Sequence, residues 1–201
     1  MTENQSNIAI LLLAAGASAR LGQPKQLLEI GEHTLLEKMA GEALASGCWP
    51  VVVVLGAISE KIKPAIAHLP VQIALNENWE NGMGSSISSG IRFLQNKYPE
   101  VETTIVMLCD QPYVKTEILL HLVETWRETG KGIVASSYSG SFGPPVLFDR
   151  RFFPELAVLK GEPGAKSVML AHQDELALAP FPAGEIDLDT QADYEKLPFC
   201  S

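Results

Sequence analysis

Residues 8–25 read IAILLLAAGASARLGQPK, an apolar run that passes directly into a loop of small residues. The apolar part, from Ile8 to Ala14, is typical of a strand buried in a core. Small residues after a strand let the backbone approach a ligand closely, and their N–H groups can surround an oxyanion. Arg20 adds a planar fork of donors and Lys25 adds a point charge, and both suit a triphosphate. The stretch therefore predicts a strand and an anion-binding loop; the alternative is a tight turn with two solvated cations.

The glycine spacing of this loop differs from that of two familiar nucleotide-binding motifs. A dinucleotide fingerprint reads G-x-G-x-x-G, which Gly16 and Gly22 do not fit. A P-loop needs Lys and then Ser or Thr directly after its last glycine, whereas Gln23 and Pro24 follow Gly22. Both folds are therefore disfavoured.

Strand-like apolar runs alternate with helical patterns along the rest of the chain. Further strands are expected at residues 51–55, 71–75, 104–108, 133–137 and 175–180. A capping box from Thr34 to Glu37 predicts a helix that ends at Gly47, and similar patterns predict helices at 59–68, 85–97, 116–129, 164–172 and 190–197. This alternation indicates an α/β fold with a mostly parallel sheet between two helical layers, and we expect one domain over residues 1–201. The Gly- and Pro-containing stretch 138–145 is expected to form a flap or a sheet crossover.

The composition restricts the classes of protein and partner. Of the 201 residues 46% are hydrophobic, which is too apolar for a disordered chain. Fifteen Lys and Arg against 24 Asp and Glu leave a formal charge of −9, which argues against a nucleic-acid partner. The longest apolar run is too short to span a bilayer and follows a segment without basic residues, so neither a membrane span nor a signal peptide is expected. Three widely spaced cysteines indicate reduced thiols, and we expect a cytoplasmic protein.

In open α/β sheets, ligands lie at the carboxyl ends of the strands, and the strand expected at 104–108 ends in a carboxylate, Asp110. Magnesium prefers one or two carboxylates together with substrate phosphates and water, so Asp110 is a candidate ligand for Mg²⁺. The alternative is that Asp110 caps the next helix, but that helix is expected to begin nearer Thr116, which is the better cap. Cys109 alternates with core positions and is interpreted as packing.

A second polar stretch, residues 76–90, reads NENWENGMGSSISSG. Gly82 and Gly84 precede a Ser-rich helix start, where free N–H groups attract anions. Ser85 or Ser86 is expected either to bind ribose and phosphate or to cap this helix. No G-x-S-x-G elbow runs through these serines, so a serine hydrolase is disfavoured.

Two carboxylates near the end of the chain, Asp187 and Asp189, are candidates for a second metal ligand. Because they are two residues apart, both lie on the same side of an extended segment. A solvated acidic turn or a helix cap is the alternative. The spacing leaves the choice open; we favour Asp187 as the ligand and Asp189 as the cap of the helix that follows.

These motifs together resemble the nucleotidyltransferases that activate molybdopterin and sugar phosphates. Residues 11–28, LLLAAGASARLGQPKQLL, are similar to their signature loop L-A-A-G-x-S-x-R-x-G-x-x-K, and LCDQP at 108–112 resembles their metal-binding turn. The D-Q-P sequence and the 76–90 stretch resemble the branch of molybdenum cofactor cytidylyltransferases. The family's D-I-D-T-P motif departs here at Gln191, which stands where Pro is usual. The segments 143–146 and 161–166 resemble the acceptor-side loops, with Glu162 in place of the usual Asp.

The resemblance implies a three-layer α/β/α Rossmann-like nucleotidyltransferase fold and a set of site residues. It assigns catalytic roles to Arg20, Lys25 and Asp110, and Mg²⁺ ligation to Asp110 and Asp187. The nucleotide contacts that it implies are made by Ala14, Ala15, Gly16, Ser18, Arg20, Lys25, Gly82 and Ser86.

The implied reaction is the Mg²⁺-dependent transfer of CMP from CTP to molybdopterin with release of pyrophosphate. No general base is required, because a phosphate acceptor is already ionised at neutral pH. Guanylyl transfer, or transfer of another nucleotide to a pterin, sugar or polyol phosphate, is the first alternative; guanylyl relatives tend to have Gly-Gly where this chain has Ala15 and Gly16. A non-catalytic carrier that delivers the molybdenum cofactor is the second, and a domain that binds a nucleotide only as a signal is the third. A client molybdoenzyme is a further partner that the resemblance suggests.

Overall fold

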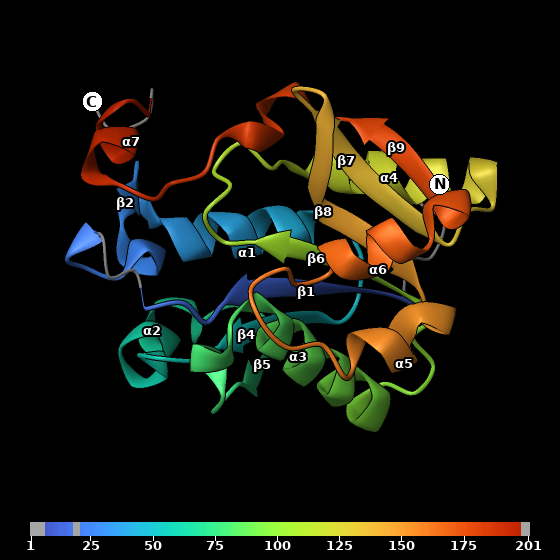
Figure 1. Ribbon diagram of the computed structural model, residues 1–201. Helices are drawn as coiled ribbons and strands as arrows, with labels where there is room; N and C mark the ends of the chain where they lie inside the picture. Colours follow the sequence, from blue (N-terminus) through green and yellow to red (C-terminus); the bar gives the residue numbers. More distant parts are fainter. Residues whose placement is uncertain (1–6, 18–20, 198–201) are drawn as a thin grey trace.

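A seven-stranded sheet runs through the centre of the computed structural model, which describes residues 7–17 and 21–197 (Figure 1). The strand order is β5-β4-β1-β6-β8-β7-β9, and among these strands β8 runs antiparallel to both of its neighbours. The other pairs are parallel, so the prediction of a mostly parallel sheet is confirmed. The strands are β1 (Ile8–Ala14), β4 (Val51–Leu55), β5 (Gln72–Leu75), β6 (Thr103–Leu108), β7 (Ile133–Tyr138), β8 (Ser141–Asp149) and β9 (Leu176–Pro180).

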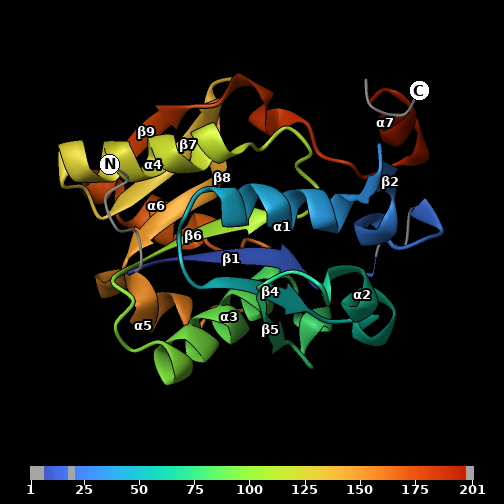
Figure 2. The ribbon, with the colours of Figure 1, turned by 180° about the vertical axis from the view of Figure 1, so that it is seen from behind.

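Helices cover both faces of this sheet, as the alternation of β1 requires. Ile8, Ile10 and Leu12 belong to one core cluster, and Ala9 and Leu11 belong to the other. Each cluster is closed by three helices, one set on each side of the sheet (Figures 1 and 2). The first set is α1 (Leu35–Ala45), α2 (Ser59–Ile66) and α4 (Thr116–Thr129); the second is α3 (Met83–Lys97), α5 (Phe153–Leu156) and α6 (Lys166–Ala171). The predicted three-layer α/β/α architecture is confirmed.

The start of α1 follows directly from the local sequence. The Glu37 N–H donates to Thr34 Oγ1 at 3.2 Å, and the Thr34 N–H donates to Glu37 Oε2 at 2.7 Å. The backbone N–H of Thr34 lowers the pKa of the Glu37 carboxyl group. Gly47, at φ +73°, follows the helix in the left-handed conformation that glycine tolerates. The predicted capping box is therefore confirmed.

The stretch 138–145, expected to be a flap or a crossover, is instead the turn of a β-hairpin and the first half of β8. The pairing of β7 with β8 shifts between Ala135 and Ser136, where Val146 and Gly143 are their respective partners. The two residues left between those partners, Pro144 and Pro145, lie in the resulting bulge. The sequence did not predict the first half of this strand, because proline has no N–H to donate to a sheet and is typical of turns.

Two expected helix caps are also wrong. The N-cap of α4 is Lys115, and Thr116 is the first helical residue, whose N–H and hydroxyl both bond Glu42 Oε2 at 2.8 Å. The N-cap of α3 is Gly82, so neither Ser85 nor Ser86 caps that helix. Thr116 bonds a residue 74 positions away, and Ser85 and Ser86 bond Asn76 in the preceding turn, so in both cases the hydroxyl has a partner other than the helix N-terminus.

The carboxyl ends of β1, β4 and β6 lie together, because these strands are parallel neighbours. A small two-stranded sheet, β2 (Glu29–Ile30) and β3 (His33–Thr34), and the last helix, α7 (Gln191–Glu195), lie beyond this edge of the sheet (Figure 1). The Tyr194 hydroxyl donates to the Glu29 carbonyl at 2.7 Å and joins α7 to β2. The helix α7 is thereby held beside β2.

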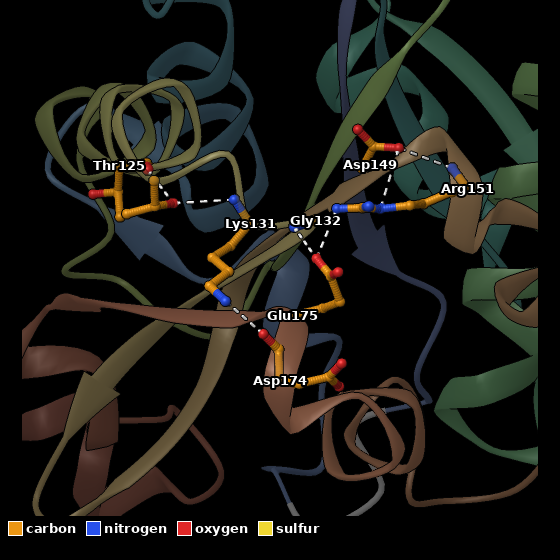
Figure 3. Close-up of polar contacts among 8 residues, drawn as sticks. Thr125, Lys131, Gly132, Asp149, Arg151, Asp174 and Glu175 are labelled. Atoms are coloured by element: carbon orange, nitrogen blue, oxygen red, sulfur yellow. Dashed lines mark hydrogen bonds and ion pairs between the residues drawn. The ribbon is translucent and has the colours of Figure 1, made fainter.

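At the opposite end of the sheet, Glu175 joins three strands (Figure 3). Its Oε2 accepts from the Gly132 N–H at 3.1 Å and from Arg151 Nη2 at 2.8 Å, which links the starts of β7 and β9 to the residues after β8. Lys131 Nζ adds a bond to the Asp174 carbonyl at 2.7 Å. These contacts are half-exposed, and we interpret them as fixing the ends of strands far from the carboxyl ends of β1, β4 and β6.

Within residues 7–17 and 21–197, no helix is both long enough and apolar enough to cross a membrane.

Two helical glycines give a matched test of how closely α3 packs on the sheet. A Cβ at Gly90 would lie 2.9 Å from Leu11 Cδ1 and 3.1 Å from Val54 Cγ2, whereas a Cβ at Gly41 in α1 would meet nothing within 4 Å. Gly90→Ala is expected to lower the free energy of unfolding by roughly 1–3 kcal/mol through overpacking. Gly41→Ala is expected to raise it by about 0.5–1 kcal/mol. Urea unfolding measures both, and a Gly90→Ala variant as stable as wild type would contradict the close packing.

Candidate functional site

Protein donors hold the loop after β1 in place. The buried side chain of Gln26 donates through Nε2 to the carbonyls of Ala14 and Gly16, both at 2.9 Å. The Ala57 N–H donates to the carbonyl between them, that of Ala15, at 3.2 Å. Three successive carbonyl oxygens are therefore bonded within the protein, which leaves them unavailable to repel an anion in front of the loop.

Gly56, directly after β4, lets this loop and the segment around Trp79 come together. A Cβ at Gly56 would lie 2.6 Å from the Ala15 carbonyl oxygen and 2.7 Å from Trp79 Cβ, so only glycine fits without displacement. The ends of β1 and β4 and the 76–86 segment therefore form one continuous wall.

Lys25 crosses from this wall to the end of β6. Its ammonium group hydrogen-bonds Asp110 Oδ2 and lies 3.4 Å from Asp189 Oδ1. Burial disfavours the charged ammonium, but the Asp110 and Asp189 carboxylates outweigh it and raise the pKa of Lys25. The lysine is therefore held charged between two carboxylates that come from distant parts of the chain.

Asp187 completes a group of three carboxylates at the same place. The Leu188 N–H donates to the backbone carbonyl of Asp110 at 2.9 Å, which fixes the 187–189 segment beside β6. Partial burial of the Asp187 carboxyl, together with the negative charges of Asp110 and Asp189, raises its pKa to about 6. The Lys25 charge and a hydrogen bond from the Gln111 side chain offset this rise of the pKa only in part.

A hydrogen-bonded turn forms the wall opposite these carboxylates. The buried Asn76 donates through Nδ2 to Ser85 Oγ at 2.8 Å and to Ser86 Oγ at 3.0 Å. Gly82 packs against another loop, since a Cβ there would lie 2.7 Å from the carbonyl carbon of Gly161. Gly82, which the resemblance implies as a nucleotide contact, thus also lets the loop at Gly161 pack closely against this turn.

The walls enclose a cavity of about 500 Å³, within the range of small-molecule sites. Every site residue predicted from the sequence that falls on described residues lines it: Ala14, Ala15, Gly16, Lys25, Gly82, Ser86, Asp110 and Asp187. The predicted residues Ser18 and Arg20 lie outside the described residues. These residues come from positions up to 173 apart in the sequence, from 14 to 187.

A smaller cavity of about 230 Å³ adjoins the first and shares Met83, Leu108 and Glu162 with it. Its other walls are mostly apolar and come from the β7–β8 hairpin and from α6, with Lys166 at its edge. The segments 143–146 and 161–166, interpreted from the sequence as acceptor-side loops, both contribute to its lining.

The carboxylates suit a divalent cation that also binds a ligand. Asp110 Oδ1 is buried and has no hydrogen-bond partner among the described residues, as expected of an oxygen that binds a cation. No group of three or more His, Cys, Asp or Glu side chains in the described ranges is arranged to hold a metal by itself. Magnesium does not require such a group, because it accepts one or two carboxylates and completes its shell with phosphates and water. Asp110 and Asp187 therefore fit a metal bound together with a phosphorylated ligand.

Two interpretations of single residues need correction or addition. Asp189 was expected to cap the last helix, but Thr190 is the N-cap of α7 and Asp189 instead contacts Lys25. Gln26 and Gly56 were not identified from the sequence. Their contacts join segments that local sequence patterns do not relate.

The Asp187 carboxyl is predicted to titrate near pH 6 in the folded protein, against about 3.8 in an unfolded chain. A raised pKa means that the folded state binds this proton more tightly, so its contribution to stability is full below pH 4 and is lost as the pH rises through 6. Titration of the aspartate carboxyl carbons by NMR measures the value directly. Asp110→Asn is expected to lower it, because one negative charge is removed; an unchanged pKa in that variant would show that the two carboxylates do not interact.

Comparisons with known proteins agree with this arrangement. The model of the MobA-like NTP transferase domain matches residues 10–176. The chain is 34% identical over 165 residues to nicotine blue oxidoreductase of Paenarthrobacter nicotinovorans, covering 78% of each chain. It is 29% identical over 195 residues to purine catabolism protein PucB of Bacillus subtilis (strain 168), covering 92% of this chain and 93% of that protein.

Solved structures share the whole fold. The crystal structure of a Mycobacterium tuberculosis Rv0371c homolog from Mycobacterium sp. strain JC1 superposes with a TM-score of 0.83 at 30% identity, covering 96% of this chain and 95% of that chain. A manganese complex of Rv0371C from Mycobacterium tuberculosis H37Rv superposes with a TM-score of 0.78 at 25% identity, covering 95% and 97%.

The matched family segment contains most of the site. It includes the loop after β1, the 76–86 turn, Asp110 and the 161–166 loop, and it ends before Asp187 and Asp189. The fold, the cavity and the family match agree with one another. The chain belongs to the MobA-like NTP transferase domain family and is a nucleotidyltransferase.

Proposed function

We propose that this nucleotidyltransferase transfers CMP from CTP to molybdopterin and releases pyrophosphate, with Mg²⁺ as its metal. The observation that carries the proposal is the meeting of Lys25 with Asp110, Asp187 and Asp189 at one end of a nucleotide-sized cavity. The choice of CTP and of molybdopterin rests on the sequence resemblance, in particular on Ala15-Gly16 and on the D-Q-P turn. The manganese complex of the mycobacterial relative supports a divalent metal in this fold.

In this proposal the loop after β1 binds the base and ribose, and the cations act on the phosphates. Lys25 is held charged, so it can stabilise the negative charge that develops on the leaving pyrophosphate. Asp110 and Asp187 would hold Mg²⁺, which would supply charge neutralisation for the phosphates of the nucleotide. The protein's work is to position two anions for in-line attack, and this needs no general base when the acceptor is a phosphate.

The smaller cavity is proposed to receive the acceptor. Its apolar walls, including Phe142 and Met169, suit the faces of a flat ring, and Lys166 suits an anionic substituent. Because it shares Leu108 and Met83 with the larger cavity, an acceptor bound there would reach the end of β6.

The first test of the proposed function is nucleotide selection and pyrophosphate release. Calorimetry with Mg²⁺ and each of CTP, GTP, ATP and UTP is expected to show a preference for CTP, and molybdopterin is expected to trigger release of pyrophosphate. A preference for another base would move the substrate to the guanylyl or sugar-phosphate alternatives. Binding without pyrophosphate release would contradict transfer and favour a carrier, or an oxidation–reduction such as the name of the Paenarthrobacter relative indicates.

The roles of Lys25 and Asp110 predict that Lys25→Ala and Asp110→Asn each lower kcat by at least about 10²-fold, the usual effect of removing one preorganised charge from a transition state. Both variants should remain folded, because each side chain lies at the edge of a cavity. The exposed Lys61→Ala variant is the matched control and should keep wild-type activity. Near-normal turnover in either site variant would contradict the proposed transfer mechanism.

The contact between Lys25 and Asp110 predicts a second, opposite effect of the lysine on metal binding. Without nucleotide, the ammonium group neutralises the carboxylates that a cation would use. Lys25→Met is therefore expected to bind Mn²⁺ several-fold more tightly than wild type in the absence of nucleotide, since it removes a positive charge that is paired with Asp110, one of the two proposed ligands. Electron paramagnetic resonance of free Mn²⁺ measures this affinity. Weaker binding by the variant would mean that Lys25 does not compete with the metal.

A further inference from the structure

Gln111, the residue after Asp110, is almost completely buried, at 2% exposure. Its Nε2 donates to the Gly184 carbonyl at 2.9 Å and to the Pro144 carbonyl at 3.3 Å. Both of these oxygens only accept, so the amide nitrogen must face them. The Gln111 side chain also hydrogen-bonds the Asp187 carboxylate directly, which lowers the pKa of that carboxyl group. The orientation of the carboxamide is thereby determined by the chemistry of its neighbours.

The two carbonyls belong to different parts of the site. Gly184 lies in a short 3-10 helix, Pro182–Glu185, directly before the segment that carries Asp187. Pro144 lies in the bulge of β8 and lines the smaller cavity. One side chain at the end of β6 therefore bonds both to the turn that leads to Asp187 and to the hairpin of the neighbouring cavity.

The turn and the hairpin are themselves packed on a shared ring. A Cβ at Gly184 would overlap the Tyr138 ring, and a Cβ at Gly143 would overlap the Tyr138 hydroxyl. The Phe181 N–H also donates to the Ser137 carbonyl at 2.9 Å. Because hairpin, ring and turn are in close contact, a displacement at Gly184 or at Pro144 moves the others.

We propose that Gln111 is a positioning residue that sets the separation of Asp187 from Asp110 and couples it to the hairpin of the smaller cavity. The inference rests on the proposed function insofar as these two carboxylates hold the metal. The burial of the side chain supports it. Gln111 Oε1 is buried with no partner among the described residues, an arrangement that costs stability and that an apolar side chain would avoid. A polar group kept at such a position acts through the bonds that it does make.

The test compares Gln111→Met, which keeps the volume and removes the hydrogen bonds to Gly184, Pro144 and Asp187, with the control Gln95→Met at an exposed position on α3. Mn²⁺ is titrated into each full-length protein and free Mn²⁺ is followed by electron paramagnetic resonance. Gln111→Met is expected to bind Mn²⁺ about 10–100-fold more weakly than wild type, the usual effect of removing a group that orients a metal ligand. Affinity for CTP without metal should change less than about two-fold, whereas general damage to the fold would weaken both.

A double-mutant cycle identifies the carboxylate through which Gln111 acts. In an Asp187→Asn background, Gln111→Met is expected to weaken Mn²⁺ binding by less than about two-fold, because effects that act through one group are not additive. Full additivity would overturn the assignment to Asp187. Should Gln111→Met fail to fold, Gln111→Asn serves instead, since its shorter amide cannot reach both carbonyls; Mn²⁺ affinity equal to wild type would then refute positioning.

The outcome separates this inference from the proposed function. A wild-type protein that binds Mn²⁺ through Asp187 and yet releases no pyrophosphate would refute the transfer reaction and leave the role of Gln111 standing. Gln111→Met with wild-type affinity for Mn²⁺ would refute the role of Gln111 and leave the reaction standing.

Discussion

The ion pair between Lys25 and Asp110 is the contact on which the site depends. It joins residues 85 positions apart and closes the loop after β1 onto the end of β6. The backbone of Asp110 makes a second long-range bond, to Leu188, which brings Asp187 and Asp189 to the same place. The contacts of Asp110, after β6, therefore bring Lys25, Asp187 and Asp189 to the wall of the same cavity.

The topology explains why these groups meet and why a second cavity lies beside them. Parallel strands β1, β4 and β6 end at one edge of the sheet, so the residues that follow each strand become neighbours. The antiparallel strand β8 interrupts this pattern next to β6. Its bulge at Pro144 and Pro145 opens the hairpin that lines the smaller, apolar cavity. The larger cavity, which holds the charged groups, and the smaller, mostly apolar cavity therefore share Leu108 in their walls.

Most of the fold could be predicted because its signals are local. The predicted bounds of β1, β4 and α4 agree with the structure, since apolar runs and, for α4, a final glycine indicate them. The strand β8 was missed because two prolines contradict the local pattern of a strand, and only its neighbours β6 and β7 make it one. The site was predictable to the extent that its residues directly follow strands, as Gly16 and Asp110 do. Gln26 was not predicted, and the contacts of Gln111 and Asp189 were not either, because each depends on a partner brought close only by the complete fold.

In the proposed function, Asp110 and Asp187 jointly bind one divalent cation and the nucleotide occupies the larger cavity. The most direct measurement is the anomalous diffraction of Mn²⁺ in crystals grown with a CTP analogue that cannot release pyrophosphate. We predict a single strong peak in contact with both carboxylates and with the phosphates, and Lys25 moved from Asp110 to the phosphates. A peak away from these carboxylates, or a nucleotide bound with Lys25 still paired to Asp110, would contradict it.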